Sequence, residues 1–587
     1  MLTHIFSTGA WGRRWLAVCF VVLLTVVSAA AQPTLNWQRY LGAPLTGEYG
    51  TGTLRLSATR LVTTGSWESA DYDTYRALLI FTRPNGDTIN VSFTAQLPTV
   101  GDWMSPVAAD NGDFYIAGGA EDTLPNGTVE YPSYICRFDS LGNVRWSHRY
   151  VVSGLASVRR IVALPDGVLV VSLVPGTLSG RAELRRLDGQ GNVRWVRYFN
   201  TSAQDLTALA DGSYAVLTNG RGPYPPPWSF WTTDMRIYKV SPQGDSITDV
   251  FVGDSGANDI GNRLQVTTDG GLVVVGQQSV QPSTTPRRGI LRKLDANWQE
   301  QWRYSFQPPT GNYQAGGEYF DVHELVTGNF LLTGTPRNIG RLDEVAAPGT
   351  NVWTWTPPPA TGGIIPQGVH LLYDAPTTSW RLTGSGSQQF PGMGRRDLWL
   401  ASLGNLPAPA VVNYCTIPPG PPVASFQAVG GPSTLRFTLD RAATPAGPLY
   451  AEISRVTWDF GDGSPLDTGL VVTHTYASPA SVRVRCTVTN NLFCTSTADL
   501  WPLGVDEDAA LAAAVSIWPN PSATGRFAVR APRGATYTVF DATGRAVVTG
   551  RLMGEEGAIR LTEAAPGVYA LRLAWADGRT LTRRLVR

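Results

Sequence analysis

Short apolar strands recur between residues 32 and 412, and turns rich in Asp-Gly and Asn-Gly precede them. Two clear copies run from Asp166 to Val171 and from Asp269 to Gly276. Asp-Gly and Asn-Gly tolerate the positive φ angles that a tight hairpin requires. The strands after these turns are apolar at nearly every position, which is typical of strands buried on both faces. Seven candidate copies can be counted, and they start at Leu54, Asn111, Asp166, Asp211, Asp269, Val322 and Val369.

A second element consists of a strand, a turn and a strand that ends on Trp, in the pattern D-x-x-G-x-x-x-W. It occurs from Asp139 to Trp146 and from Asp188 to Trp195, with weaker copies at Lys239 to Asp245 and Lys293 to Trp302. The whole unit returns at roughly 45 to 60 residues, a period that indicates a propeller or an array. Seven four-stranded units in residues 32–412 predict a seven-bladed β-propeller.

The two ends of this region indicate how the propeller closes. The last unit ends at Asp397 to Leu403 without a following strand that ends on Trp, whereas the mature chain begins with a Trp-containing strand, Leu35 to Tyr40. We therefore expect the first strand to complete the last blade and so remove both open edges. The repeats resemble those of quinoprotein-type propellers, in which Trp side chains dock between blades. This resemblance concerns the fold alone, and neither a quinone nor any other cofactor is predicted.

A separate block covers residues 423–502, after a Pro-rich linker at 413–422. It contains W-D-F-G-D-G at 458–463 and H-T-Y at 474–476. These motifs resemble the signature of the PKD domain, which implies an Ig-like β-sandwich that acts as a spacer or as a second binding module. A structural, hydrogen-bonded role is expected for His474 and Asp462, because no catalytic motif surrounds them. The motif residues are Trp458, Asp459, Gly461, Asp462, Gly463, His474 and Tyr476.

The C-terminal segment, residues 515–587, follows a second linker at 503–514. It reads as short alternating strands separated by turn residues. Pro-Asn-Pro is followed by a strand that ends in D-x-x-G-R, and then by P-G-x-Y. This order resembles the type A sorting domain of type IX secretion in Bacteroidota. The resemblance implies a second Ig-like sandwich, the type IX machinery as partner, and release from, or display on, a Gram-negative cell. The motif residues are Pro519, Asn520, Pro521, Gly544, Pro566, Gly567 and Tyr569.

The N-terminus has the pattern of a secretory signal. An apolar run from Trp15 to Val27 follows Arg13 and Arg14. At about 13 residues this run is shorter than the roughly 20 that a membrane-spanning helix needs. Small residues then lead to a cleavage site between Ala31 and Gln32. We therefore predict a signal peptide at residues 1–31 and no transmembrane anchor.

Charge and cysteine content narrow the range of functions. The chain has 47 basic and 46 acidic residues, a net charge of +1, which gives no reason to expect nucleic acid as a partner. Cys486 and Cys494 flank a turn candidate and can pair across a hairpin. Cys415 can instead reach either of them, and the sequence leaves the connectivity open. No Cys or His spacing predicts a metal site.

Candidate chemistry is sparse in the sequence. No catalytic motif is recognisable, and His323, beside Glu324, is the best single candidate for an acid–base residue. Binding has clearer candidates, because Pro-rich stretches at 222–231 and 353–359 present aromatic side chains that can stack on sugars or contact a protein. These aromatics can equally cover the flank of the propeller. Those of the first stretch are Tyr224, Trp228, Phe230 and Trp231.

Taken together, the patterns predict an all-β protein: a seven-bladed β-propeller followed by two Ig-like β-sandwich domains. The first functional hypothesis is a secreted or cell-surface, non-enzymatic binding or adhesion protein, with extracellular glycans or proteins as ligands. The alternative is an extracellular hydrolase whose active site lies on a propeller face. Two carboxylates about 5 to 9.5 Å apart in an open cleft would favour glycoside hydrolysis.

Overall fold

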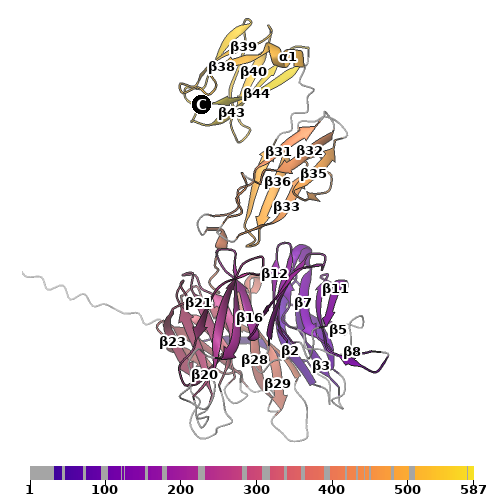
Figure 1. The fold of residues 1–587 in the computed structure, drawn as a ribbon, viewed down its shortest axis with the longest axis vertical. Helices are drawn as coiled ribbons and strands as arrows, with labels where there is room; N and C mark the ends of the chain where they lie inside the picture. The colour runs from indigo at the N-terminus through magenta and orange to yellow at the C-terminus, as the bar shows by residue number, and fades with distance from the viewer. Residues whose placement is uncertain are drawn as a thin grey trace, which may run out of the picture.

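The computed structural model shows a chain built almost entirely of β-strands (Figure 1). Within the described residues there is one α-helix, α1 (Ala509–Ala514), and three 3-10 turns at Asp110–Gly112, Ala375–Thr377 and Tyr414–Thr416. The predicted signal peptide lies outside the described residues. The structure describes residues 32–41, 47–69, 75–93, 104–120, 122–124, 126–151, 157–174, 181–221, 232–280, 287–306, 317–335, 340–358, 364–388, 397–416, 420–430, 434–441, 443–447, 451–476, 482–500, 509–577 and 579–587.

The region up to residue 404 contains seven sheets of four antiparallel strands each in its described part, and a small pair, β8 (Asp122–Thr123) with β9 (Val129–Glu130). The strands of the seven sheets, in spatial order, are β2 (Gly47–Arg55), β3 (Leu61–Glu68), β4 (Tyr75–Thr82) and β5 (Thr88–Phe93); β6 (Val107–Ala108), β7 (Phe114–Gly119), β10 (Pro132–Phe138) and β11 (Val144–Val151); β12 (Ser157–Leu164), β13 (Gly167–Val174), β14 (Arg181–Asp188) and β15 (Val193–Phe199); β16 (Ser202–Ala208), β17 (Tyr214–Arg221), β18 (Thr233–Val240) and β19 (Ser246–Val252); β20 (Ala257–Val266), β21 (Leu272–Val280), β22 (Arg288–Leu294) and β23 (Glu300–Phe306); β24 (Tyr319–Glu324), β25 (Phe330–Gly334), β26 (Arg341–Ala346) and β27 (Thr350–Trp355); β28 (Ile364–Asp374), β29 (Ser379–Gln388), β30 (Asp397–Gly404) and β1 (Thr34–Leu41).

The first strand of the chain belongs to the last sheet. β1 pairs antiparallel with β30, with Gln38 opposite Ala401 and Tyr40 opposite Trp399. This is the pairing that the sequence predicts for the two ends of the region. It joins segments more than 350 positions apart in the sequence, so an otherwise open sheet edge is covered by the chain itself.

Apolar clusters join each sheet to its neighbour. Val62 and Phe81 of one sheet pack with Phe114 and Phe138 of the next. Leu78 and Leu400 belong to a further cluster, which joins the first sheet in the chain to the last. The first strands of the sheets also contact one another in series, β12 with β16, β16 with β20, β20 with β24, and β24 with β28. Sheets arranged radially around a common axis in this way form a β-propeller.

The D-x-x-G-x-x-x-W pattern links neighbouring sheets. Trp146 of β11 donates a hydrogen bond from Nε1 to the carbonyl oxygen of Gly189 at 3.0 Å, in the turn of the next sheet. Its ring lies on Gly191, which has a φ of +88° and where an added Cβ would stand 2.8 Å from the indole. Trp195 repeats the arrangement, donating to the carbonyl oxygen of Pro242 at 3.0 Å. The glycine is therefore required both by backbone conformation and by the Trp that covers it.

The second domain consists of two sheets that pack on a core containing Trp458 and Phe437, both fully buried. The indole of Trp458 donates to the carbonyl oxygen of Gly469 at 2.8 Å. The two sheets are β31 (Phe426–Gly430), β32 (Thr434–Leu439) and β35 (Val471–Thr475), and β34 (Asp467–Thr468), β33 (Ile453–Asp459), β36 (Val484–Asn490) and β37 (Thr495–Leu500).

The C-terminal domain also has two sheets. Leu511 of α1 packs into their core with Val529 and Leu571, so the segment expected to be a linker at 503–514 contributes a buried residue to this domain. The two sheets are β38 (Ser516–Trp518), β39 (Arg526–Arg530) and β42 (Glu556–Arg560), and β41 (Ala546–Arg551), β40 (Thr536–Phe540), β43 (Val568–Ala574) and β44 (Thr580–Val586).

Candidate functional site

The two faces of the propeller differ in the connections that they carry. Turns between the first and second strands of a sheet are short, as at residues 165–166 between β12 and β13. Connections between second and third strands lie at the opposite ends of the strands and include residues 222–232 and 389–396. The predicted binding aromatics Tyr224, Trp228, Phe230 and Trp231 fall in the first of these connections and lie outside the described residues. Of the second aromatic stretch, Trp353 is buried in the core between two sheets.

The PKD-like domain docks on the face with the short turns (Figure 1). Arg455 of β33 forms an ion pair with Asp110 at 2.6 Å. Asn491 donates to the carbonyl oxygen of Gly212 at 2.8 Å, and Tyr414 donates to that of Ala208 at 3.2 Å. Arg455 also donates to the carbonyl oxygen of Pro165, in the turn between β12 and β13, so the contacts together reach three successive sheets. Among the described residues, none of these contacts with the second domain lies on the opposite face, which carries the longer connections.

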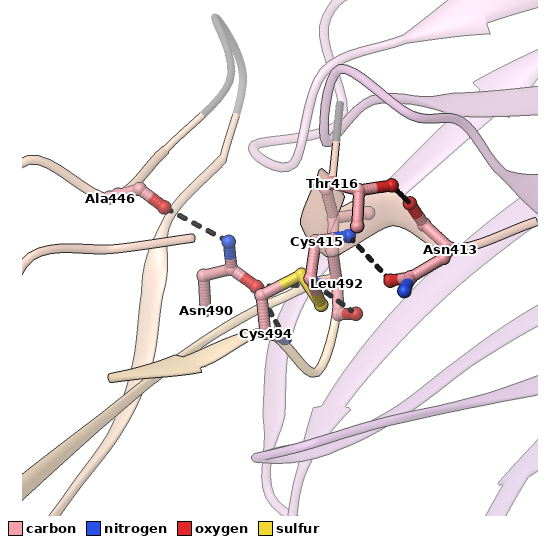
Figure 2. Close-up of a disulfide and its surroundings, with 7 residues drawn as sticks. All are labelled: Asn413, Cys415, Thr416, Ala446, Asn490, Leu492 and Cys494. Atoms are coloured by element: carbon pink, nitrogen blue, oxygen red, sulfur yellow. Dashed lines mark hydrogen bonds between the residues drawn. A yellow bond between two sulfur atoms is a disulfide. The ribbon is translucent and has the colours of Figure 1, made fainter. Parts of the chain in front are cut away.

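A disulfide reinforces this junction, and it differs from the predicted hairpin pair. Cys415 is bonded to Cys494, with 5.3 Å between their Cα atoms (Figure 2). Cys486 is a buried free thiol. In the hairpin of β36 and β37, Cys486 lies opposite Ala498, and Cys494 lies opposite Asn490. Four residues at about 3.4 Å each separate the two cysteines along the strand, beyond the ~7 Å that a disulfide spans. The possible pairing of Cys486 with Cys494 therefore does not form, and of the pairings that the sequence left open the structure has Cys415–Cys494.

Charged side chains gather where the first strands meet. Among the described residues, the first strands β2, β12, β16, β20, β24 and β28 have a register irregularity at an equivalent place, for example between Ala203 and Asp205 of β16. The residues just after it alternate in charge around the axis, and we call them the axial ring: Arg160, Asp205, Arg263, Asp321 and His370. This group was not found from the sequence, because its members lie on five different sheets.

Ion pairs connect the axial ring from one sheet to the next. Arg160 Nε lies 3.2 Å from Asp205 Oδ1, Arg263 Nη1 lies 3.6 Å from the same oxygen, and Arg263 Nε lies 3.1 Å from Asp321 Oδ1. His323, the acid–base candidate from the sequence, lies 3.7 Å from Asp321 and packs edge-on against Trp380. It belongs to this network rather than to a separate catalytic group.

The surroundings of the ring fix its charge states. Burial by itself would raise the pKa of Asp321, but Arg263 and the two histidines outweigh it and hold that pKa well below its usual value. Burial lowers the pKa of His370 to about 3, so its imidazole is neutral. Burial and the neighbouring charge of Arg263 lower the pKa of Arg160 to about 10. At neutral pH Arg160 and Arg263 are therefore charged, Asp321 is a carboxylate and His370 is neutral.

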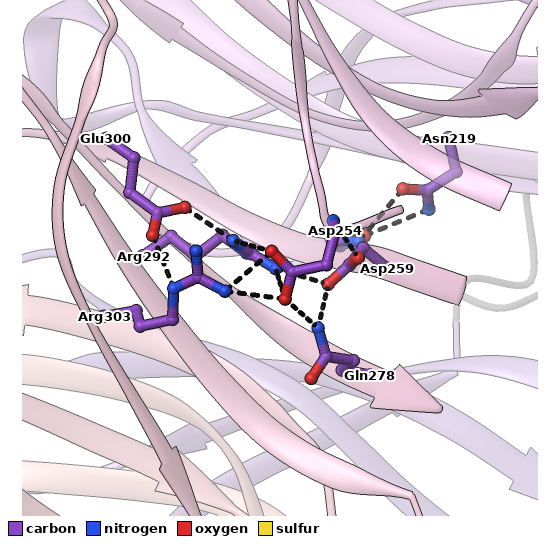
Figure 3. A network of polar contacts seen from close by, with 8 residues as sticks. Asn219, Asp254, Asp259, Gln278, Arg292, Glu300 and Arg303 are labelled. Atoms are coloured by element: carbon purple, nitrogen blue, oxygen red, sulfur yellow. Dashed lines mark hydrogen bonds and ion pairs between the residues drawn. The ribbon is translucent and has the colours of Figure 1, made fainter. Parts of the chain in front are cut away.

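A second polar network joins two adjacent sheets near the connection between β19 and β20 (Figure 3). Arg292 bridges Asp259 at 2.8 Å and Asp254 at 3.1 Å, and Arg303 binds Asp254 at 2.6 Å. Gln278 donates a further hydrogen bond to Asp259 at 2.9 Å. Burial would raise the pKa of Asp254, but the two arginines lower it to about 2. Arginines therefore occupy these carboxylates, which hold the connection between β19 and β20 to the sheet of β20 to β23.

Asp234 is the exception among the acidic groups near this network. It is fully buried, and within the described residues neither carboxyl oxygen has a hydrogen-bond partner. An added Cβ on Gly253 would lie 2.8 Å from Asp234 Oδ1 and 3.2 Å from Asp259 Oδ2, so the two carboxyl groups flank one point. Burial and the charge of Asp259 raise the pKa of Asp234 to about 7. This pair is closed to solvent and therefore does not form the open cleft that a glycosidase requires.

The PKD motif residues carry structural contacts. The His474 ring stacks on Phe460 with centroids 3.9 Å apart, and His474 Nε2 lies 2.8 Å from Asp462 Oδ2. Hydrogen bonds from Ser464 and His474 lower the pKa of Asp462 to about 2. Tyr476 donates to the carbonyl oxygen of Phe460 at 3.3 Å. The remaining motif residues form the core and the turn: Trp458, Asp459, Gly461 and Gly463.

The C-terminal motif residues hold the last strand in place. Asn520 accepts a hydrogen bond from the Val586 N–H at 2.9 Å and donates to the carbonyl oxygen of Arg584 at 2.6 Å. Gly567 exchanges two backbone hydrogen bonds with Arg587, at 2.9 and 3.0 Å. Gly544 has a φ of +81° in the turn that begins at Asp541. Pro519 and Pro521 follow cis peptide bonds, Pro566 precedes Gly567, and the Tyr569 hydroxyl donates to the carbonyl oxygen of Ala565.

Comparison with known families identifies the two C-terminal domains. Residues 421–499 match the family described as PKD domain, and residues 516–587 match the secretion system C-terminal sorting domain. The comparison with curated proteins gave no match. The chain therefore contains a PKD domain and the sorting domain of a type IX secretion substrate. No helix in the described part of the chain has the length and apolar character needed to cross a membrane.

Several solved structures resemble the chain at low sequence identity. The β-propeller domain of the trilobed protease from Pyrococcus furiosus is 10% identical, with a TM-score of 0.35, over 66% of this chain and 99% of that one. A protein from Lactobacillus plantarum is 10% identical, with a TM-score of 0.36, over 62% and 98%. A protein of unknown function from Bacteroides caccae is 11% identical, with a TM-score of 0.24, over 46% and 84%.

These observations define the class of the protein. It is a secreted or cell-surface protein with an N-terminal β-propeller, a PKD domain, and a C-terminal domain that directs export by type IX secretion.

Proposed function

We propose that this protein is a non-enzymatic binding or adhesion protein of the outer cell surface or the medium. In this proposal residues 32–412 form a closed, seven-bladed propeller, and the face opposite the PKD domain binds an extracellular glycan or protein. The PKD domain is an Ig-like spacer that holds this face outward.

The observation that carries the proposal is the position of the PKD domain. It is fastened to the short-turn face by the Cys415–Cys494 bond and by the Arg455–Asp110 ion pair. A domain held in this way covers one face and leaves the other exposed. Surface loops on a rigid scaffold commonly carry binding residues. The Pro-rich aromatic connection at 222–232 joins strand ends on that second face.

The carboxylates support binding rather than hydrolysis. In the described part of the chain, Asp254 and Asp259 are held by arginines, and Asp234 is enclosed. Neither the arginine-bound pair of Asp254 and Asp259 nor the enclosed Asp234 offers a substrate an open pair of carboxylates. Among the described residues there is also no group of three His, Cys, Asp or Glu side chains that could hold a metal ion.

The export route forms the rest of the proposal. We infer that the host is a Gram-negative Bacteroidota bacterium, and that residues 1–31 are removed between Ala31 and Gln32. The tail is then a type A sorting domain, and the type IX machinery is its partner. The match of residues 516–587 to the sorting-domain family supports this route.

A glycan array probed with the labelled mature chain, residues 32–587, tests the proposed function. A matched pair of variants tests the face: Trp228→Ala removes an aromatic on the predicted binding face, and Leu141→Ala changes an exposed residue in a turn on the PKD face. We expect binding to fall with Trp228→Ala and to persist with Leu141→Ala. Equal loss or equal retention would contradict the assignment of the face. New reducing ends released from a bound polysaccharide would establish the hydrolase alternative instead.

A further inference from the structure

Arg160 has unsatisfied hydrogen-bond donors in the axial ring. Its side chain is 20% exposed, and it forms an ion pair with Asp205, in which Arg160 Nε lies 3.2 Å from Asp205 Oδ1. The buried Nε has no hydrogen-bond partner, and the guanidinium donates no hydrogen bond to a described residue. A guanidinium carries five N–H donors, and buried polar groups in proteins are normally hydrogen-bonded. The described residues therefore supply no acceptor for these donors of Arg160.

Arg263 brings a second guanidinium to the same place. Nitrogen atoms of Arg160 and Arg263 lie 3.2 and 3.6 Å from one oxygen, Asp205 Oδ1. Both guanidiniums are therefore near each other and share a single carboxylate oxygen. One guanidinium binds a carboxylate or phosphate through two parallel N–H groups, so two guanidiniums at one place favour an oxyanion.

The carboxylates of the ring are turned away from solvent. Asp205 Oδ2 accepts the Leu264 N–H at 2.7 Å, and Asp321 accepts the N–H groups of Val322 and Leu371 at 3.0 and 2.9 Å. The side chains of Asp205 and Asp321 are 2% and 1% exposed, whereas Arg263 is 15% exposed. The part of the ring that solvent reaches is consequently cationic.

On its other side, Arg160 faces a neutral section of the axis. The equivalent position on β2 is Gly52, and an added Cβ there would lie 2.3 Å from Ser105 Oγ. Ser105 donates to the carbonyl oxygen of Thr51 at 2.7 Å, and His370 is neutral. No carboxylate occupies these equivalent positions, so among the described residues the charge of Arg160 is compensated from the side of Asp205.

We propose that Arg160 and Arg263 form a binding site on the propeller axis for a small oxyanion: a carboxylate, sulfate or phosphate group. Such a group would accept the free N–H donors of Arg160 and complete the alternation of charge around the ring. The oxyanion can come from a free inorganic ion or from the carboxylate of an acidic sugar. This site is separate from the proposed ligand face and does not depend on it.

Thermal unfolding of the mature chain tests the site. The melting temperature is followed while sodium sulfate, sodium phosphate or sodium glucuronate is added at constant ionic strength, balanced with sodium chloride. We expect a saturable rise for at least one of these anions, with an affinity at least about tenfold weaker in Arg160→Gln, because a charge-assisted bond is lost. Arg145→Gln, which changes an arginine 58% exposed on another sheet, is the matched control and should respond as the wild type does.

Two further measurements keep the test decisive. If Arg160→Gln does not fold, Arg160→Lys keeps the charge but loses the bidentate fork, and it should also bind more weakly. In crystals grown with selenate, the anomalous signal should lie between Arg160 and Arg263. A stronger response to glucuronate than to sulfate would assign the site to an acidic sugar, and the reverse to a free ion. A rise that does not saturate and is equal in all variants, or a selenate signal that is absent from the axis, would overturn the proposal and leave water there.

Discussion

Removing the bond between Cys415 and Cys494 should destabilise the PKD domain specifically. The bond closes a loop of 79 residues that contains almost the whole domain. In the chain-entropy description a loop of that length corresponds to about 4.5 kcal/mol of stabilisation. The other contacts at the junction are smaller: the partly exposed Arg455–Asp110 ion pair contributes about 0.2–1 kcal/mol, and the hydrogen bond from Asn491 about 1 kcal/mol. The disulfide is thus the largest single term at this junction.

Differential scanning calorimetry of Cys415→Ser measures this effect. For a domain of this size, 1 kcal/mol shifts the melting temperature by about 4–8 °C, so we expect the PKD transition to fall by about 20 °C or more. The propeller transition should change little, because its apolar clusters lie outside the closed loop. Cys486→Ala is the matched control, since it removes a buried thiol of the same domain without breaking a bond. A large drop for Cys486→Ala together with no change for Cys415→Ser would refute the connectivity and the reasoning built on it.

Three other expectations follow from the structure. Gly191→Ala should destabilise the propeller by at least about 1 kcal/mol more than Gly112→Ala in denaturant unfolding. Both glycines have a positive φ, but of the two only Gly191 is covered by Trp146. Equal effects would contradict the role of the Trp. Asp234→Asn should stabilise the protein by on the order of 3 kcal/mol at pH 8 and little at pH 4. The pKa of Asp234 is raised to about 7, so the folded protein holds a proton on this carboxyl group below pH 7, and the stability that comes with this proton is lost as the pH rises through 7. The opposite pH dependence in thermal melts would exclude a raised pKa. Deleting residues 515–587 should keep the folded propeller inside the cell envelope, as fractionation of the host would show; a truncated protein found in the medium would contradict the sorting role.

The elements of the fold could be predicted from the sequence because each depends on residues that are neighbours in the chain. Asp-Gly turns indicate hairpins, apolar runs indicate buried strands, and the motif around Trp458 indicates the core of a PKD domain. The sequence left the disulfide open for the same reason. Proximity in the sequence suggested Cys486 with Cys494, but strand register places Cys486 opposite Ala498, four residues away from Cys494 along the hairpin. Register depends on which side chains are buried, and a short sequence window does not reveal it.

The axial ring shows how a group spread over several sheets still leaves a trace in the sequence. Its members are brought together by the radial packing of sheets, so no local motif contains two of them. Yet Arg160, Asp205 and Arg263 each stand six positions before the Asp of an Asp-Gly turn, and Asp321 stands six positions before Thr327 of a Thr-Gly turn. The offset is constant because the turn ends the first strand at one height, and the irregularity in that strand recurs at a fixed distance above it. Charged residues at a constant offset from successive turns of a propeller therefore indicate a shared ring on its axis, and the sign of each residue indicates which neighbours pair and which lack a partner.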